Sequence, residues 1–212
     1  TRGSKRAKKE KDGVMEMHPG QWLYEEGMAY RQGLDFKTID KERGQLMIEA
    51  SASSGFPMAV AHCHFHGWNG LKKDQKRAFD MFVKIEKETN GYHWAQYMVG
   101  VCYRYGYGVA KNDEKRFEYF SLSAEQGNSL AMNSIGYCYE KGLGTDVNKT
   151  KAFEWLGKSA NLGYSRAMCS VGVCYQRGTG VTKDLNKARE WLTKSAAHGD
   201  RRGQQLLRVI DL

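Results

Sequence analysis

Small and apolar residues return along this chain at the spacing of one helical face. Between residues 167 and 202, four of them fall at i, i+4, i+5 and i+8, on one side of an α-helix: Ala167, Val171, Gly172 and Tyr175. The pattern predicts a first helix over about 167–177. A second amphipathic stretch begins after Asp184, which can cap a helix start, and Gly199 supplies a left-handed residue that closes it. This segment is therefore expected to form a helix hairpin.

The same pattern returns every 36 residues. Glycine keeps this step in three series: Gly55, Gly91, Gly127, Gly163 and Gly199; Gly100, Gly136 and Gly172; Gly108, Gly144 and Gly180. Cysteine and tyrosine keep it as well: Cys102, Cys138 and Cys174; Tyr103, Tyr139 and Tyr175. One hairpin cannot bury its apolar face alone, so neighbouring hairpins must stack. The sequence predicts an all-α fold, a right-handed α-solenoid superhelix of tandem helix-turn-helix repeats.

We predict five repeats over residues 21–202, of which the first two are less regular. Their approximate boundaries are 21–55, 56–94, 95–130, 131–166 and 167–202. Each second helix is predicted to begin at a short capping side chain: Asp40, Asp74, Asn112, Asn148 and Asp184. Residues 203–212 are expected to form a capping helix over the open end, and residues 1–20 a basic disordered tail or residues left by cloning.

The most regular repeat carries a family resemblance. Residues 131–144 read AMNSIGYCYEKGLG and residues 151–163 read KAFEWLGKSANLG, which resembles the Sel-1-like repeat, a relative of the tetratricopeptide repeat. The resemblance covers roughly residues 21–202 and is weaker in the first two repeats, where Met28 and His62 replace the small residue of the first helix. It implies a non-catalytic scaffold whose inner groove binds a peptide or a partner protein.

The five cysteines are expected to be small, buried, free residues. Some secreted bacterial relatives carry a disulfide in each repeat, but here the second-helix place opposite Cys169 holds Ser195 or Ala196. Free thiols favour a cytoplasmic or nuclear location. The basic run of Lys5, Arg6, Lys8 and Lys9 is of the kind that nuclear import receptors read, or belongs to a solvated tail.

Residue chemistry gives little indication of catalysis. The chain has no nucleophile-and-base arrangement and no phosphate-binding glycine loop, so we do not expect an enzyme or a cofactor. His62 and His66 share a helical face at i, i+4, as two zinc ligands would, but matched further ligands are missing apart from His93. We expect these histidines to pack or hydrogen-bond instead. No apolar stretch reaches the roughly 20 residues of a membrane span.

The non-repeating side chains of the first helices are the best candidates for a binding site, because they point away from the packing face. This rule selects the following groove residues: His66, Tyr97, Val101, Arg104, Tyr105, Asn133, Tyr137, Glu140, Lys141, Cys169, Val173, Gln176 and Arg177. Aromatic and arginine side chains are typical anchors of protein interfaces. We therefore predict a scaffold or adaptor that binds a protein or peptide partner, in an oligomeric state that the sequence leaves open.

Two other functions fit the sequence less well. The chain could be a regulatory or targeting module of a larger protein whose catalytic domain lies outside this sequence. Nucleic-acid binding by the solenoid is not expected: although the formal charge is +9, no continuous basic stripe with interleaved aromatic residues crosses the repeats.

Overall fold

The computed structural model describes residues 18–35 and 37–210, and these residues form eleven α-helices and no strands. In chain order the helices are α1 (Pro19–Gln32), α2 (Lys41–Ser53), α3 (Pro57–His66), α4 (Gln75–Glu88), α5 (His93–Tyr105), α6 (Asp113–Glu125), α7 (Ser129–Lys141), α8 (Lys149–Asn161), α9 (Ser165–Arg177), α10 (Leu185–Ala197) and α11 (Arg201–Ile210). The predicted all-α solenoid is confirmed.

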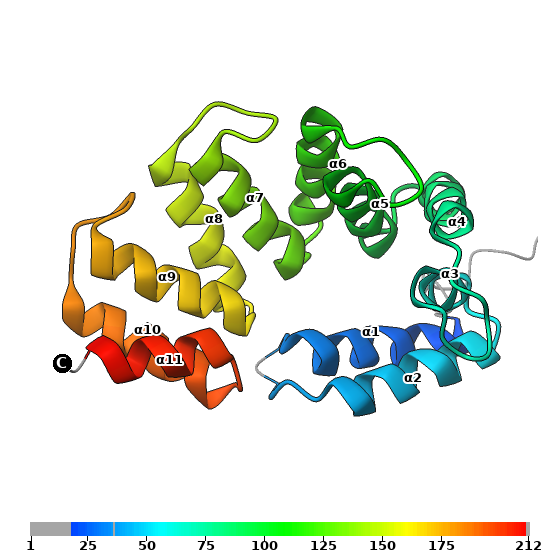
Figure 1. The fold of residues 1–212 in the computed structure, drawn as a ribbon, viewed down its shortest axis with the longest axis horizontal. Helices are drawn as coiled ribbons and strands as arrows, with labels where there is room; N and C mark the ends of the chain where they lie inside the picture. The colour runs from blue at the N-terminus through cyan, green and yellow to red at the C-terminus, as the bar shows by residue number, and fades with distance from the viewer. Residues whose placement is uncertain (1–17, 36, 211–212) are drawn as a thin grey trace, which may run out of the picture.

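Consecutive helices pack as hairpins, α1 with α2 through α9 with α10, and each hairpin stacks on the next. The hairpins follow one another around the centre of the molecule, and α11 packs on α10 (Figure 1). The predicted first helix of the last repeat begins two residues earlier than expected, at Ser165. Because the hairpins stack around this centre, the first helices form the inner layer of a curved array.

The predicted caps of the second helices are confirmed in all five hairpins. Each side-chain oxygen accepts a hydrogen bond from the backbone N–H three residues later, at 2.8–3.0 Å. These bonds satisfy one of the backbone donors that a helix start leaves unpaired. Asp200 does the same for α11, because its carboxylate accepts from the Gly203 N–H at 2.7 Å. The starts of all these helices are therefore fixed by local sequence.

In four hairpins, a buried serine of the second helix bonds to the first helix of the same hairpin. Its hydroxyl donates to a backbone carbonyl at the start of the first helix of the same hairpin, at 2.6–2.8 Å. The four pairs are Ser51 with Gly20, Ser123 with His93, Ser159 with Ser129, and Ser195 with Ser165. The sequence pattern did not single out these serines. They fix the register of one helix of a hairpin against the other.

Two glycine series have different structural reasons. Gly136 lies inside α7, where a Cβ atom would stand 2.7 Å from Leu156 of α8, so its absence lets the two helices approach. Gly144 lies in the following turn with a φ of 73°, and a Cβ there would overlap the Asp113 carbonyl of the preceding hairpin. The first series thus sets the spacing within a hairpin, and the second sets the spacing between hairpins.

Aromatic pairs join successive hairpins. Tyr103, Tyr139 and Tyr175 lie edge-on to Phe79, Phe117 and Phe153 of the preceding second helix, with ring centroids 5.8, 5.4 and 5.3 Å apart. Such T-shaped pairs add to the stabilisation from buried area. The 36-residue period of tyrosine is therefore the period of the contact between repeats.

The first and last hairpins meet through backbone hydrogen bonds. The Ser165 N–H donates to the Gly33 carbonyl at 3.1 Å, and the Ile39 N–H donates to the His198 carbonyl at 3.4 Å. Leu34, in the same connection between α1 and α2, is only 4% exposed. We call these contacts of Gly33 and Ile39 with Ser165 and His198 the seam. The seam closes the superhelix on itself, which the repeat pattern did not predict.

Candidate functional site

A cavity of about 1320 Å³ occupies the centre of the closed superhelix. Residues of α5, α7 and α9 line it, as expected for the inner helices of a solenoid. Two further segments, 38–42 and 199–202, complete the lining beside the seam. The site is thus built from three consecutive first helices and from the two ends of the repeat array.

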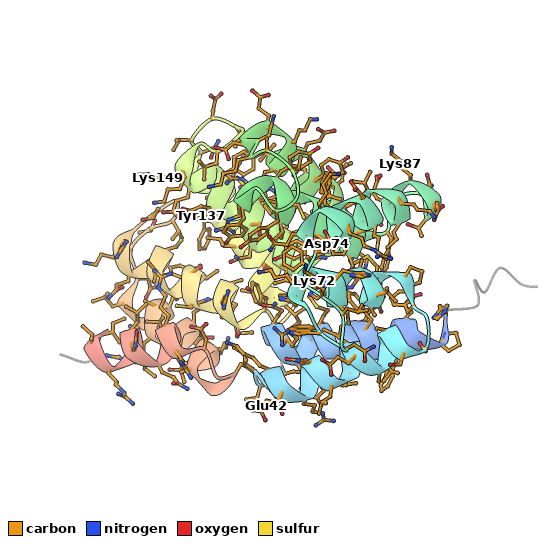
Figure 2. All side chains as sticks on the ribbon, turned by 45° about the vertical axis from the view of Figure 1, so that its right-hand side comes forward. Glu42, Lys72, Asp74, Lys87, Tyr137 and Lys149 are labelled. Atoms are coloured by element: carbon orange, nitrogen blue, oxygen red, sulfur yellow. The ribbon has the colours of Figure 1, made fainter. Side chains whose placement is uncertain are left out.

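Most of the predicted groove residues line this cavity. They are Tyr97, Val101, Arg104, Tyr105, Asn133, Tyr137, Glu140, Lys141, Cys169 and Arg177. Tyr137 lies toward the middle of the molecule, whereas Lys87 and Lys149 lie at its edge (Figure 2). Val173, Gln176 and His66 are not part of the lining. That the lining residues bind a partner stays a prediction.

Exposed aromatic rings flank an arginine in the cavity. Tyr105 and Tyr137 are 46% and 40% exposed, more than any other tyrosine or phenylalanine among the described residues. The Arg104 guanidinium carbon lies 4.8 Å from the centre of the Tyr105 ring and 5.5 Å from that of Tyr137. Cation–π contacts of this kind hold a guanidinium in place without using its hydrogen-bond donors. Arg104 is therefore oriented and still able to bind an acceptor.

A second tyrosine and arginine pair lies where α9 begins. Tyr164 is buried, and its hydroxyl lies close to the Arg166 guanidinium. Burial raises the pKa of Tyr164 and of Tyr97, so both phenols stay neutral at physiological pH. Arg166 also faces the Asp200 carboxylate. This part of the lining offers neutral hydroxyl groups beside a permanent positive charge.

Basic groups outnumber acidic groups in the lining. The seven basic residues are Lys41, Arg104, Lys141, Arg166, Arg177, Arg201 and Arg202, and the four acidic ones are Asp40, Glu42, Glu140 and Asp200. Asp40 and Asp200 accept hydrogen bonds as helix caps, and Glu140 pairs with Lys141 at 2.8 Å. The cavity thus presents a net positive charge to whatever enters it.

The sequence rule missed several lining residues, among them Tyr164, Arg166 and segments 38–42 and 199–202. The rule chose positions inside first helices only. Tyr164 and Arg166 lie at the start of α9, directly after the recurring Gly163, and that place in the period was the available signal. The two segments join the site only because the seam closes.

The histidines of α3 pack among aromatic rings. His62 is buried with its Nδ1 atom 3.3 Å from the Tyr24 hydroxyl, and burial lowers its pKa well below the ordinary value. His66 stacks on Trp68 with ring centroids 4.2 Å apart, and burial lowers its pKa to about 4. Within the described residues, no group of three or more His, Cys, Asp or Glu side chains is placed to hold a metal.

All five cysteines are free and buried, as predicted. Burial raises the pKa of the Cys102 and Cys169 thiols to about 12, so neither is a thiolate at neutral pH. The basic run from Lys5 to Lys9 lies outside the described residues. Across the described helices, none has the length and apolar character needed to cross a membrane.

Comparison with known families defines the class of protein. The Sel1 repeat matches residues 58–85, 95–128, 129–164 and 165–200, and the chain belongs to this family. Sel1 repeat proteins are in general helical scaffolds for protein–protein interaction without catalytic activity. The match begins at residue 58, so it leaves out the hairpin of α1 and α2.

Solved structures from several organisms are similar to this chain. A Sel1 repeat protein from Oxalobacter formigenes is 27% identical with a TM-score of 0.67, over 89% of this chain and 72% of that one. The protective antigen c5321 of uropathogenic Escherichia coli is 29% identical with a TM-score of 0.64, over 90% of this chain. This chain spans only 41% of that antigen.

A third structure supports the fold alone. Cysteine rich protein B of Helicobacter pylori is 23% identical with a TM-score of 0.51, over 64% of this chain and 96% of that one. A comparison with curated proteins found no match.

Proposed function

We propose that this chain is an interaction module that binds a peptide segment of a partner protein in its central cavity. The observation that carries the proposal is the pair of exposed rings, Tyr105 and Tyr137, that face a cavity of about 1320 Å³. Aromatic and arginine side chains in a concave, preformed site are the usual energetic centres of an interface. The general role of Sel1 repeats as interaction scaffolds supports the same function.

The size and polarity of the cavity favour a peptide over a small metabolite. Pockets for small molecules usually measure about 300–1000 Å³ and are mostly apolar. This cavity is larger, and eleven charged side chains line it. Asn133, beside Tyr137 in the lining, adds an amide that can bond to the main chain of an extended segment.

Selection from a random peptide library displayed on phage, followed by affinity measurement, tests the proposal. We expect the selected peptides to bind Tyr137→Ala at least about tenfold more weakly than the wild type, the loss typical of an interface centre. Leu46→Ala is the matched control, because Leu46 is the most exposed large apolar residue of α2 and lies outside the cavity lining. Its affinity should stay within twofold of the wild type.

Two results would contradict the proposed function. Peptides that bind the wild type and Tyr137→Ala equally well would place binding on another surface. A selection that enriches no binding peptide would remove the support for peptide recognition altogether.

A further inference from the structure

The charges of the cavity are not balanced by partners inside it. The four acidic residues of the lining are largely engaged, two as helix caps and Glu140 in its ion pair with Lys141. Within the part of the chain that the structure describes, Arg104 takes part in no ion pair and is held by ring contacts alone. An occupant that supplies anionic groups would complete this arrangement.

The geometry around Arg104 indicates which anionic group fits. Its guanidinium is packed against Tyr105 and Tyr137, so the N–H donors remain available at the edge of the plane. A carboxylate matches two parallel donors of a guanidinium, and such charge-assisted pairs are stronger than neutral hydrogen bonds. The flanking rings offer apolar surface to the side chains next to that carboxylate. Arg104 and its rings thus form a mixed acidic and apolar subsite.

Arg166 provides a second cationic position in the same cavity. Its guanidinium lies beside the Tyr164 hydroxyl, and the Asp200 carboxylate near it already accepts a hydrogen bond from the Gly203 N–H. Arg177, Arg201 and Arg202 add charge to the same lining. Several cationic positions around one cavity suit a segment that carries several carboxylates.

We infer that the occupant of the cavity is an acidic peptide segment whose Asp or Glu carboxylates bind Arg104 and Arg166 while its apolar side chains contact Tyr105 and Tyr137. This inference rests on the proposed function and assigns the chemistry of the partner. A nucleic acid is the less suitable polyanion, because Glu140 and Asp200 would stand close to its unbroken row of phosphates.

Fluorescence polarisation with three 12-residue, fluorescein-labelled peptides tests the inference. Each has two phenylalanines and six variable positions, filled with Asp and Glu, with Asn and Gln, or with Lys. The acidic peptide should bind the wild-type protein at least about tenfold more tightly than the Asn/Gln peptide. The affinity of the acidic peptide should fall as the salt concentration rises from about 50 to about 300 mM, because salt screens the attraction between the carboxylates and the arginines.

Variants localise the effect. Arg104→Gln should weaken binding of the acidic peptide about tenfold, and Arg104→Lys, which keeps the charge but loses the planar fork, about threefold. Glu140→Gln should strengthen it about twofold, because an acidic group leaves the cavity. Arg77→Gln is the matched control: Arg77 is exposed on α4 outside the cavity lining, and its loss should change the affinity less than twofold.

Three results would overturn the inference. These are equal affinity for the acidic and the Asn/Gln peptides, equal losses in Arg104→Gln and Arg77→Gln, and tighter binding of a 12-nucleotide single-stranded DNA that Arg104→Gln weakens. If neutral or basic peptides bound the wild type and Tyr137→Ala weakened that binding, the proposed function would stand and only the acidic character of the partner would be wrong. Melting curves of Arg104→Gln and Arg104→Lys that match the wild type show that lost binding is not lost folding.

Discussion

Arg116 is an exception among the residues that pack the hairpins. It stands on α6 at the place where the other second helices carry small residues: Gly44, Ala78, Ala152 and Ala188. The residue is 6% exposed, and its Nη1 atom lies 3.2 Å from Asp113 Oδ1. In the described structure its Nε and Nη2 atoms have no hydrogen-bond partner. A buried guanidinium with one half-exposed partner regains little of its lost hydration.

We predict that Asp113→Ala lowers the free energy of unfolding by about 1–3 kcal/mol, because it leaves the buried charge uncompensated. Arg116→Met, which keeps much of the volume without the charge, should be as stable as the wild type or more so. In the Arg116→Met background, Asp113→Ala should cost less than about 0.5 kcal/mol. Urea denaturation followed by circular dichroism measures all three variants.

Glu114→Ala is the control for this pair, because Glu114 lies in the same first turn of α6 and shares its interaction with the helix dipole. It should change the free energy of unfolding by a few tenths of a kcal/mol. If Arg116→Met were less stable than the wild type by more than about 1 kcal/mol, the ion pair would be net stabilising and the interpretation wrong.

At the scale of one element, the buried serine found in four of the five second helices is a cross-link within its hairpin. The fully buried Ser159 hydroxyl donates to the Ser129 carbonyl at 2.6 Å. The hairpin of α3 and α4 has Ile85 at this place and lacks the bond. In the four hairpins that have it, this one hydrogen bond fixes the position of one helix along the other.

We predict that Ser159→Ala lowers the free energy of unfolding by about 1–2 kcal/mol, the contribution of a buried hydrogen bond. The matched control is Ser121→Ala on α6, because the Ser121 hydroxyl donates only to the Phe117 carbonyl of its own helix. That change should be nearly neutral, since alanine favours a helix more than serine does. Equal losses in thermal unfolding of the two variants would contradict a cross-linking role for Ser159.

The helices and their caps show which features of the fold could be predicted from the sequence. The period and the capping residues predicted the helix pairs because both are local: Asp184 and its counterparts lie one turn from the groups they satisfy. The groove positions in α5 and α7 were predictable for the same reason, since place within the repeat decides which face a side chain takes. Ser159 was not predicted, because its partner is a carbonyl 30 residues away. Arg116 was not predicted either, because it departs from the small residue that the period has at this place.

The curvature of the whole molecule could not be predicted. Segments 38–42 and 199–202 join the cavity because small rotations between successive repeats add up until the ends meet. No single repeat encodes that sum. The sequence therefore located the inner side chains of the array but not the residues that close it.

At the scale of the whole molecule, the seam is expected to couple the stability of the first hairpin to that of the last hairpin. Gly33→Val tests this, because Gly33 has a φ of 65° and a Cβ atom there would lie 2.7 Å from Ser165 Oγ. We predict that the Ser165 and Ile39 amides, which donate across the seam, exchange with solvent hydrogen at least about tenfold faster in this variant. Hydrogen-exchange mass spectrometry over residues 161–170 and 37–45 measures both.

Gly67→Val provides the matched control. Gly67 ends α3 as Gly33 ends α1, in the same left-handed conformation, but its neighbour is Lys73 within its own hairpin. The two substitutions introduce similar backbone strain. If Gly67→Val accelerated exchange at Ser165 as much as Gly33→Val did, the effect would be general loosening and the seam would not couple the ends.

Closure has a consequence for the energetics of recognition. An open superhelix is elastic, because its pitch changes at little cost in free energy. A ligand that fits only one pitch must select that conformation, and the free energy of this selection is lost from the binding affinity. Here the Gly33 and His198 carbonyls anchor the two ends to each other. Conformational entropy is thus given up during folding and not during binding, and a short segment that touches only a few side chains can still be held.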